Sequence, residues 1–123
     1  MYSEKVMEHF MMPQNVGFLL EPDGMGIAGE SCSDNVKMYI QVRGGIITQI
    51  RFLVFGCCAA IACASMTTVL AQGKSIDNAL QITEQEVVSA LEGLPEEKQH
   101  CSNMGVAALK AAIQDYLTRT YGI

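Results

Sequence analysis

The chain has 123 residues, enough for one domain with a substantial core but too few for two. Its formal net charge is -5, with only 8 Lys and Arg residues, and no basic cluster is present to neutralise phosphates. Trp is absent, so the stacking surfaces typical of single-strand binders are not evident. These features argue against nucleic acid as the main partner, and we expect one domain over residues 1–123.

Three features bear on the compartment. The first residues are polar and acidic, unlike the basic start of a secretory leader. Residues 52–71 carry no charge over the length of a membrane span, but Gly56 divides them into a strand pattern and a part rich in small residues. Five cysteines, an odd number, do not fit a secreted disulfide framework. We therefore expect reduced thiols, a cytoplasmic location and no membrane span.

The N-terminal half predicts one helix and then strands. Ser3 is suited to cap a short helix through Phe10, with His9 on its surface. The glycine-rich stretch 14–29 predicts a loop, with one short strand near residues 25–28. The next two strands are expected at 36–42, where alternate residues are apolar, and at 46–55, with Gly44-Gly45 as the hairpin turn between them.

The C-terminal half predicts helices. Residues 57–72 indicate a helix closed by Gly73, and 75–80 a short helical turn. A capping box at 83–86 opens a helix through Leu91, and Ser102 is suited to cap the last helix. The last helix has one apolar stripe, made of Val106, Leu109, Ile113, Tyr116 and Leu117. The sequence thus predicts an α+β fold, with an antiparallel sheet of about three strands packed against several helices.

Three cysteines each fall in a predicted loop or at the end of an element: Cys32, Cys57 and Cys101. Cys57 is expected where a strand gives way to a helix, and the free amides and dipole there favour the thiolate. Asp34 follows Cys32 by two residues, and His100 directly precedes Cys101. If these segments converge, the thiolates would select a soft metal such as zinc or an iron–sulfur cluster.

Several interpretations of this set remain open. Zinc would accept the three thiolates with Asp34 or His100 as the fourth ligand, and a [2Fe–2S] cluster would use the same positions. The thiolates could instead be nucleophiles that accept sulfur from a persulfide, or cysteines that only pack in the core. Cys58 and Cys63 are expected to be small buried helix residues.

The chain resembles the IscU/NifU-type iron–sulfur assembly scaffolds over its whole length. The motifs that carry the resemblance are Tyr2-Ser3-Glu4-Lys5-Val6, Pro13-Gln14-Asn15-Val16-Gly17, Cys32-Ser33-Asp34, Phe55-Gly56-Cys57, Ala60-Ile61-Ala62, Gly73-Lys74-Ser75 and His100-Cys101-Ser102. The resemblance implies the SufE/NifU-like fold and a scaffold that is not an enzyme. Such a scaffold assembles a [2Fe–2S] cluster from iron and desulfurase-derived sulfur and passes it to apo-proteins. The alternative is a zinc-binding domain or a sulfur-acceptor partner.

The resemblance also implies roles for individual residues. Cys32, Cys57 and Cys101 would hold the cluster, with Asp34 as a ligand that promotes release and His100 as the alternate ligand. Cys101 would accept the persulfide sulfur. The implied partners are a cysteine desulfurase, an electron donor such as ferredoxin, and apo-protein recipients. Zinc in the cluster-free form and a homodimer are left open.

Three departures from the family pattern affect these expectations. Cys58 stands where the family usually has Gly, and Cys63 where it usually has Ser or another small residue. The family's chaperone-docking Leu-Pro-Pro-Val-Lys becomes residues 94–98, Leu-Pro-Glu-Glu-Lys, so an Hsp70-type chaperone is an open partner.

Overall fold

The computed structural model describes residues 2–31 and 34–122, except for the side chains of residues 30, 31 and 34. Its antiparallel sheet has the order β1-β2-β3, with β1 at Gly24–Ser31, β2 at Asp34–Arg43 and β3 at Ile46–Phe55. The helices are α1 Glu4–Met11, α2 Cys58–Ala71, α3 Ile76–Ala79, α4 Glu84–Ala90 and α5 Cys101–Tyr121, with a 3-10 helix, η1, at Glu96–Lys98. This arrangement confirms the predicted α+β class.

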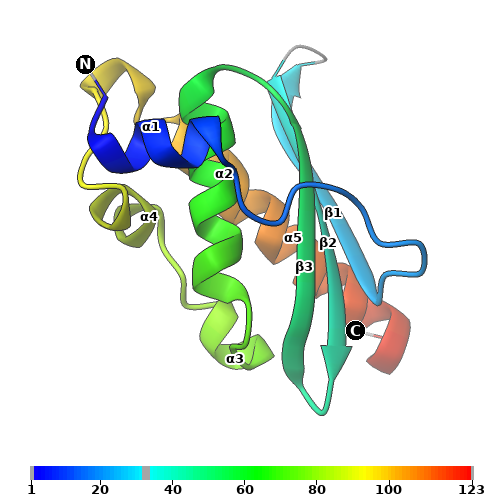
Figure 1. Cartoon of the computed structure of the whole chain (residues 1–123). Coiled ribbons are helices and arrows are strands. Elements are labelled where there is room, and N and C mark those ends of the chain that lie inside the picture. The colour runs from blue at the N-terminus through cyan, green and yellow to red at the C-terminus, as the bar shows by residue number, and fades with distance from the viewer. Residues whose placement is uncertain (1, 32–33, 123) are drawn as a thin grey trace.

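The helices cover one face of the sheet, as Figure 1 shows. α5 packs on β1 and β2, α2 packs on β3, and α1 and α4 pack on α2. The period-2 pattern of β2 explains this layering, because Val36, Met38 and Ile40 are fully buried while Lys37 is exposed.

Two glycines allow α5 to lie directly on β1. A Cβ built on Gly24 would lie 2.2 Å from the carbonyl oxygen of Ala112, and one on Gly26 would lie 2.3 Å from the amide nitrogen of Ala112. The strand expected near residues 25–28 is therefore longer than predicted. The glycines of this segment predicted a loop, but in the structure they allow α5 to pack closely on the strand.

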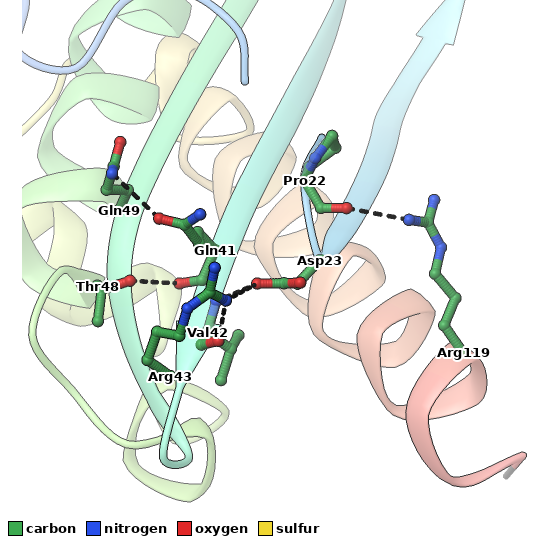
Figure 2. Close-up of polar contacts among 8 residues, drawn as sticks. All are labelled: Pro22, Asp23, Gln41, Val42, Arg43, Thr48, Gln49 and Arg119. Carbon is green, nitrogen blue, oxygen red and sulfur yellow. Dashed lines mark hydrogen bonds and ion pairs between the residues drawn. The ribbon is translucent and has the colours of Figure 1, made fainter. Parts of the chain in front are cut away.

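Polar contacts hold the end of the sheet at which β2 turns into β3. Gly44 and Gly45 make the predicted turn, with φ of 59° and 76°. Figure 2 shows Asp23 accepting hydrogen bonds from Nη1 of Arg43 at 3.0 Å and from the amide of Val42 at 2.7 Å. Arg119 of α5 donates a hydrogen bond to the carbonyl of Pro22 at 3.1 Å. Hydrogen bonds therefore join the loop before β1 both to β2 and to α5.

The helix starts agree with the predictions except at α5. Ser3 and Thr83 accept the capping hydrogen bonds of α1 and α4. At α5 the N-cap is His100 and the first helical residue is Cys101. The prediction that Ser102 caps this helix is wrong, because its hydroxyl donates instead to the carbonyl of Gln99, at 2.7 Å.

A buried histidine joins α1 to α2. His9 is 7% exposed, and its Nδ1 lies 2.7 Å from Oγ of Ser65. The same oxygen accepts a hydrogen bond from the amide of Gln14. The expectation of a surface histidine is wrong, because α1 packs on α2 through this side chain.

No helix among the described residues is both long enough and apolar enough to span a bilayer. The uncharged stretch 52–71 is divided between the end of β3 and α2, as its glycine suggested.

Candidate functional site

Cys57 and Cys101 lie side by side although 44 positions separate them in the sequence. Cys57 is the N-cap of α2, and Cys101 is the first residue of α5. Their Sγ atoms are 3.8 Å apart, and neither is in a disulfide. Folding thus brings the starts of two helices, and a thiol from each, to the end of the sheet opposite the Gly44-Gly45 turn (Figure 1).

His100 lies at the edge of this thiol pair. Its Nε2 is 3.7 Å from Sγ of Cys101, and its side chain is exposed. Cys101 itself is only 2% exposed, whereas Cys57 is half-buried. In this conformation solvent therefore reaches the imidazole and Cys57 more readily than Cys101.

Cys32 lies outside the described residues, as does the side chain of Asp34. The register of the flanking strands still locates the segment that carries them. Ser31 pairs with Asp34, and the next residue, Asn35, pairs with Phe55, two positions before Cys57. The described backbone on either side of residues 32–33 therefore reaches the same end of the sheet as the thiol pair.

The surroundings of Cys57 favour its thiolate form. Burial raises the pKa of this thiol, but the amides of Ala60 and Ala59, the thiol of Cys101 and the charge of Lys98 together hold it below its ordinary value. Both amides belong to the first turn of α2, whose N-cap is Cys57, and the free amides at a helix start favour a negative charge there. The lowered pKa agrees with the position predicted for Cys57 at the start of a helix.

The other two cysteines differ from each other. Cys63 is fully buried, as expected, and burial raises the pKa of its thiol to about 12. Cys58, expected to be buried, is half-exposed at the first position of α2. A hydrogen bond with Cys58, together with burial, raises the pKa of Tyr2 to about 12, and no sequence signal pointed to this contact.

Within the described residues, no group of three or more Cys, His, Asp or Glu side chains is arranged to hold a metal ion. What the structure brings together is two thiols and an imidazole. These donors suit Zn²⁺, Cu(I) or iron–sulfur clusters rather than Mg²⁺ or Ca²⁺. Any such centre would need a further ligand, and the segment around Cys32 and Asp34 approaches from the correct end of the sheet.

The sequence is similar to known proteins over almost its entire length. The family model described as the NifU-like N terminal domain matches residues 1–122. The iron-sulfur cluster assembly scaffold protein IscU 1 of Archaeoglobus fulgidus is 48% identical over 120 residues, which cover 97% of this chain and 78% of that protein. IscU of Escherichia coli K12 is 42% identical over 123 residues, covering 96% and 95% of the two chains.

Solved structures share the fold. A protein of Fervidobacterium islandicum, described in connection with the SUF system, superposes with a TM-score of 0.75 at 18% identity, covering 91% of this chain and 96% of that one. The N-terminal part of a NifU-like protein from Brucella abortus gives a TM-score of 0.59 at 21% identity, covering 94% and 83%. These likenesses support the NifU-like form of the α+β fold.

Proposed function

The chain belongs to the family of NifU-like N-terminal domains, and we propose that it is a scaffold on which an iron–sulfur cluster is assembled and from which it is transferred. The observation that carries this proposal is the 3.8 Å approach of the Cys57 and Cys101 sulfurs, with Nε2 of His100 3.7 Å from Cys101. Thiolates are the donors that iron–sulfur clusters require. A scaffold also has to release its cargo, and a site at the edge of the fold suits that task.

The proposed cargo is a [2Fe–2S] cluster held by Cys32, Cys57 and Cys101, with Asp34 or His100 as the fourth ligand. Four such ligands are shared between the two irons. Oxygen and imidazole are harder donors than thiolate, so the fourth position exchanges more easily and gives the cluster a route out. Zinc suits the same donors and would occupy the cluster-free site.

Sulfur is proposed to arrive as a persulfide from a cysteine desulfurase. The thiolate of Cys101 attacks the terminal sulfur of the donor persulfide, and the donor cysteine leaves as a thiolate. Because Cys101 is 2% exposed, this step requires the chain around His100 to open. Two electrons then release the sulfur as sulfide, and a ferredoxin-type donor would supply them.

Anaerobic reconstitution tests the scaffold proposal. The protein is incubated with ferrous iron, L-cysteine, a cysteine desulfurase and dithiothreitol as the electron donor, and its iron, acid-labile sulfide and visible spectrum are measured. We expect a brown protein with equal iron and sulfide, and loss of colour in Cys57→Ala and Cys101→Ala. Cys63→Ala is the matched control, because its thiol is buried away from solvent. A colourless, iron-free wild type would contradict the proposal.

Asp34→Ala separates a transient site from a structural one. If Asp34 promotes release, the variant should hold its cluster longer than the wild type in the presence of an apo-acceptor. A structural zinc site would respond in the opposite direction, with weaker metal binding.

A further inference from the structure

A groove between α4 and α5 borders the thiol pair at His100. Its volume is about 580 Å³, and its walls come from four residues of α4 (84, 85, 88 and 89) and four at the start of α5 (99, 100, 102 and 103). We call it the α4–α5 groove. His100 lines this groove while its Nε2 lies 3.7 Å from Sγ of Cys101, so the groove and the thiol pair meet at one side chain.

Three side-chain amides belong to the polar lining of the α4–α5 groove. Gln85, Gln99 and Asn103 line it and are exposed, and none of these side chains makes a hydrogen bond to another described residue. Each carboxamide offers a donor and an acceptor in the geometry of a peptide group. Val88 adds an apolar surface to the lining. Such a lining suits the main chain of an extended peptide.

The charge of the groove indicates which kind of peptide it would bind. Among the described residues that line the groove, the carboxylate of Glu84 is present and no Lys or Arg is found. The protein also carries a formal net charge of -5. A segment with a basic residue would therefore be attracted to the groove, and an acidic one repelled.

We propose that the α4–α5 groove binds an extended, cysteine-bearing segment of the apo-protein that receives the cluster, with a basic residue of that segment beside Glu84. This inference rests on the proposed scaffold function and on His100 as a cluster ligand. A thiol of the bound segment would thereby meet the exposed imidazole of His100 at the accessible edge of the thiol pair, where it would be placed to replace that ligand.

Exposure favours a recipient over a sulfur donor as the occupant. A sulfur donor must reach the thiol of Cys101, which is 2% exposed. An incoming ligand needs to reach only His100, which is exposed and lines the groove. The accessible end of the site is thus the end that a displacing ligand would use.

The test compares two transfer reactions from the cluster-loaded protein. In one, an apo-ferredoxin with a lysine beside a cluster cysteine accepts the cluster; in the other, dithiothreitol extracts it. For the double variant Gln85→Ala/Asn103→Ala we expect the second-order rate to apo-ferredoxin to fall about tenfold, because two hydrogen bonds to the segment are lost. Extraction by dithiothreitol should not change, since a small thiol does not need the groove.

Matched controls come from exposed residues outside the groove. The double variant Gln72→Ala/Gln81→Ala removes two amides elsewhere and should transfer its cluster like the wild type.

A second test changes the charge of the groove. Glu84→Gln should slow transfer to apo-ferredoxin and reduce its dependence on salt. Glu86→Gln, on the same first turn of α4 but outside the lining, should do neither.

The outcomes distinguish this inference from the function on which it rests. A wild type that holds no cluster after loading would overturn both. A loaded protein whose transfer is equally fast in the groove variant and its control would overturn the inference alone. It would also be overturned if the groove variant accepted sulfur from the desulfurase more slowly but transferred its cluster at the wild-type rate.

Discussion

A single buried imidazole couples the packing of α1 to pH. Burial lowers the pKa of His9, and the charges of Glu8 and Lys5 on the same helix change it less and in opposite directions. From α2 the imidazole meets Ser65, a neutral partner at 2.7 Å. The native protein therefore holds His9 in its neutral form at pH values where an unfolded chain would begin to protonate it.

The free energy of unfolding should consequently decrease with acid. In the unfolded chain the pKa of His9 is about 6.5, so above this pH the contribution of neutral His9 to stability is fully present. As the pH falls below about 6.5 and through the lower native pKa, the unfolded state binds the proton first, and this contribution is lost. Urea unfolding between pH 7.5 and 5 measures this. The variant His9→Asn should be less stable at pH 7.5 but show a flatter slope. Equal slopes in the two proteins would assign the pH dependence to other groups.

Among the cysteines, burial should separate reactive from inert thiols. The side chain of Cys63 is 0% exposed, so neither solvent nor reagent reaches it in the native protein. Burial also raises the pKa of its thiol to about 12. Cys57 is half-buried and has a lowered pKa. With iodoacetamide and the metal-free native protein, we expect Cys63 to be alkylated at least about a hundredfold more slowly than Cys57.

Peptide mass spectrometry assigns the alkylated sites, and the same reaction in urea supplies the control, since unfolding should equalise the two rates. Rapid labelling of Cys63 in the native protein would show that α2 opens locally. In that case Cys63 could no longer serve as the inert control in cluster reconstitution.

At the level of the elements, the seating of α5 on β1 depends on the absence of a side chain at Gly26. A Cβ there would lie within 2.3 Å of the Ala112 amide nitrogen and 2.5 Å of the Ala108 carbonyl oxygen, both backbone atoms that cannot rotate away. Any substitution therefore has to push the helix from the strand. Because Cys101 is the first residue of the same helix, such a shift would also reach the thiol pair.

Gly26→Ala should lower the free energy of unfolding by about 3 kcal/mol, at the upper end of overpacking effects. Ile27→Ala is the matched control: the next residue on β1 is 54% exposed on the opposite face, and its substitution should cost less than about 1 kcal/mol. Urea titrations monitored by circular dichroism measure both. Similar losses in the two variants would show that strand propensity, not contact with α5, governs this position.

The elements that could be predicted from the sequence are those whose signals are local. Strand β3 has the predicted bounds, because alternation and the Gly44-Gly45 turn determine its register from nearby residues. The start of α5 could not be predicted, because the Ser102 hydroxyl can either cap a helix or donate to a preceding carbonyl, and in the structure it donates to the carbonyl of Gln99. The burial of His9 likewise depends on α2, a partner more than 50 residues away in the sequence.

The same distinction applies to the candidate site at the scale of the whole molecule. Sequence motifs identify Cys57 and Cys101 as candidates, but their 3.8 Å approach results from the packing of α2 against α5. The α4–α5 groove has no sequence signature, because its two walls belong to separate helices whose relative placement is set only in the folded chain.

Because the proposed ligands come from separate elements, a bound metal should act as a cross-link of the whole fold. Zn²⁺ would join the start of α2 to the start of α5 and to the β1–β2 connection. A ligand that binds only the native state stabilises it by about 2.7 kcal/mol at a hundred times its Kd, which corresponds to roughly 10 °C in Tm for a chain of this size. We expect thermal unfolding to shift upward by this amount with Zn²⁺ and to return after chelation.

The variant series makes this linkage specific. Cys57→Ala and Cys101→Ala should each lose most of the zinc-dependent shift in Tm, because each removes a thiolate from the shared centre. Cys63→Ala should lower the baseline Tm by leaving a small cavity in α2 yet keep the full shift, because its thiol is buried within the core cluster. An equal zinc shift in all three variants would mean that the metal binds elsewhere, and the convergence of Cys57 and Cys101 would then have no role in holding it.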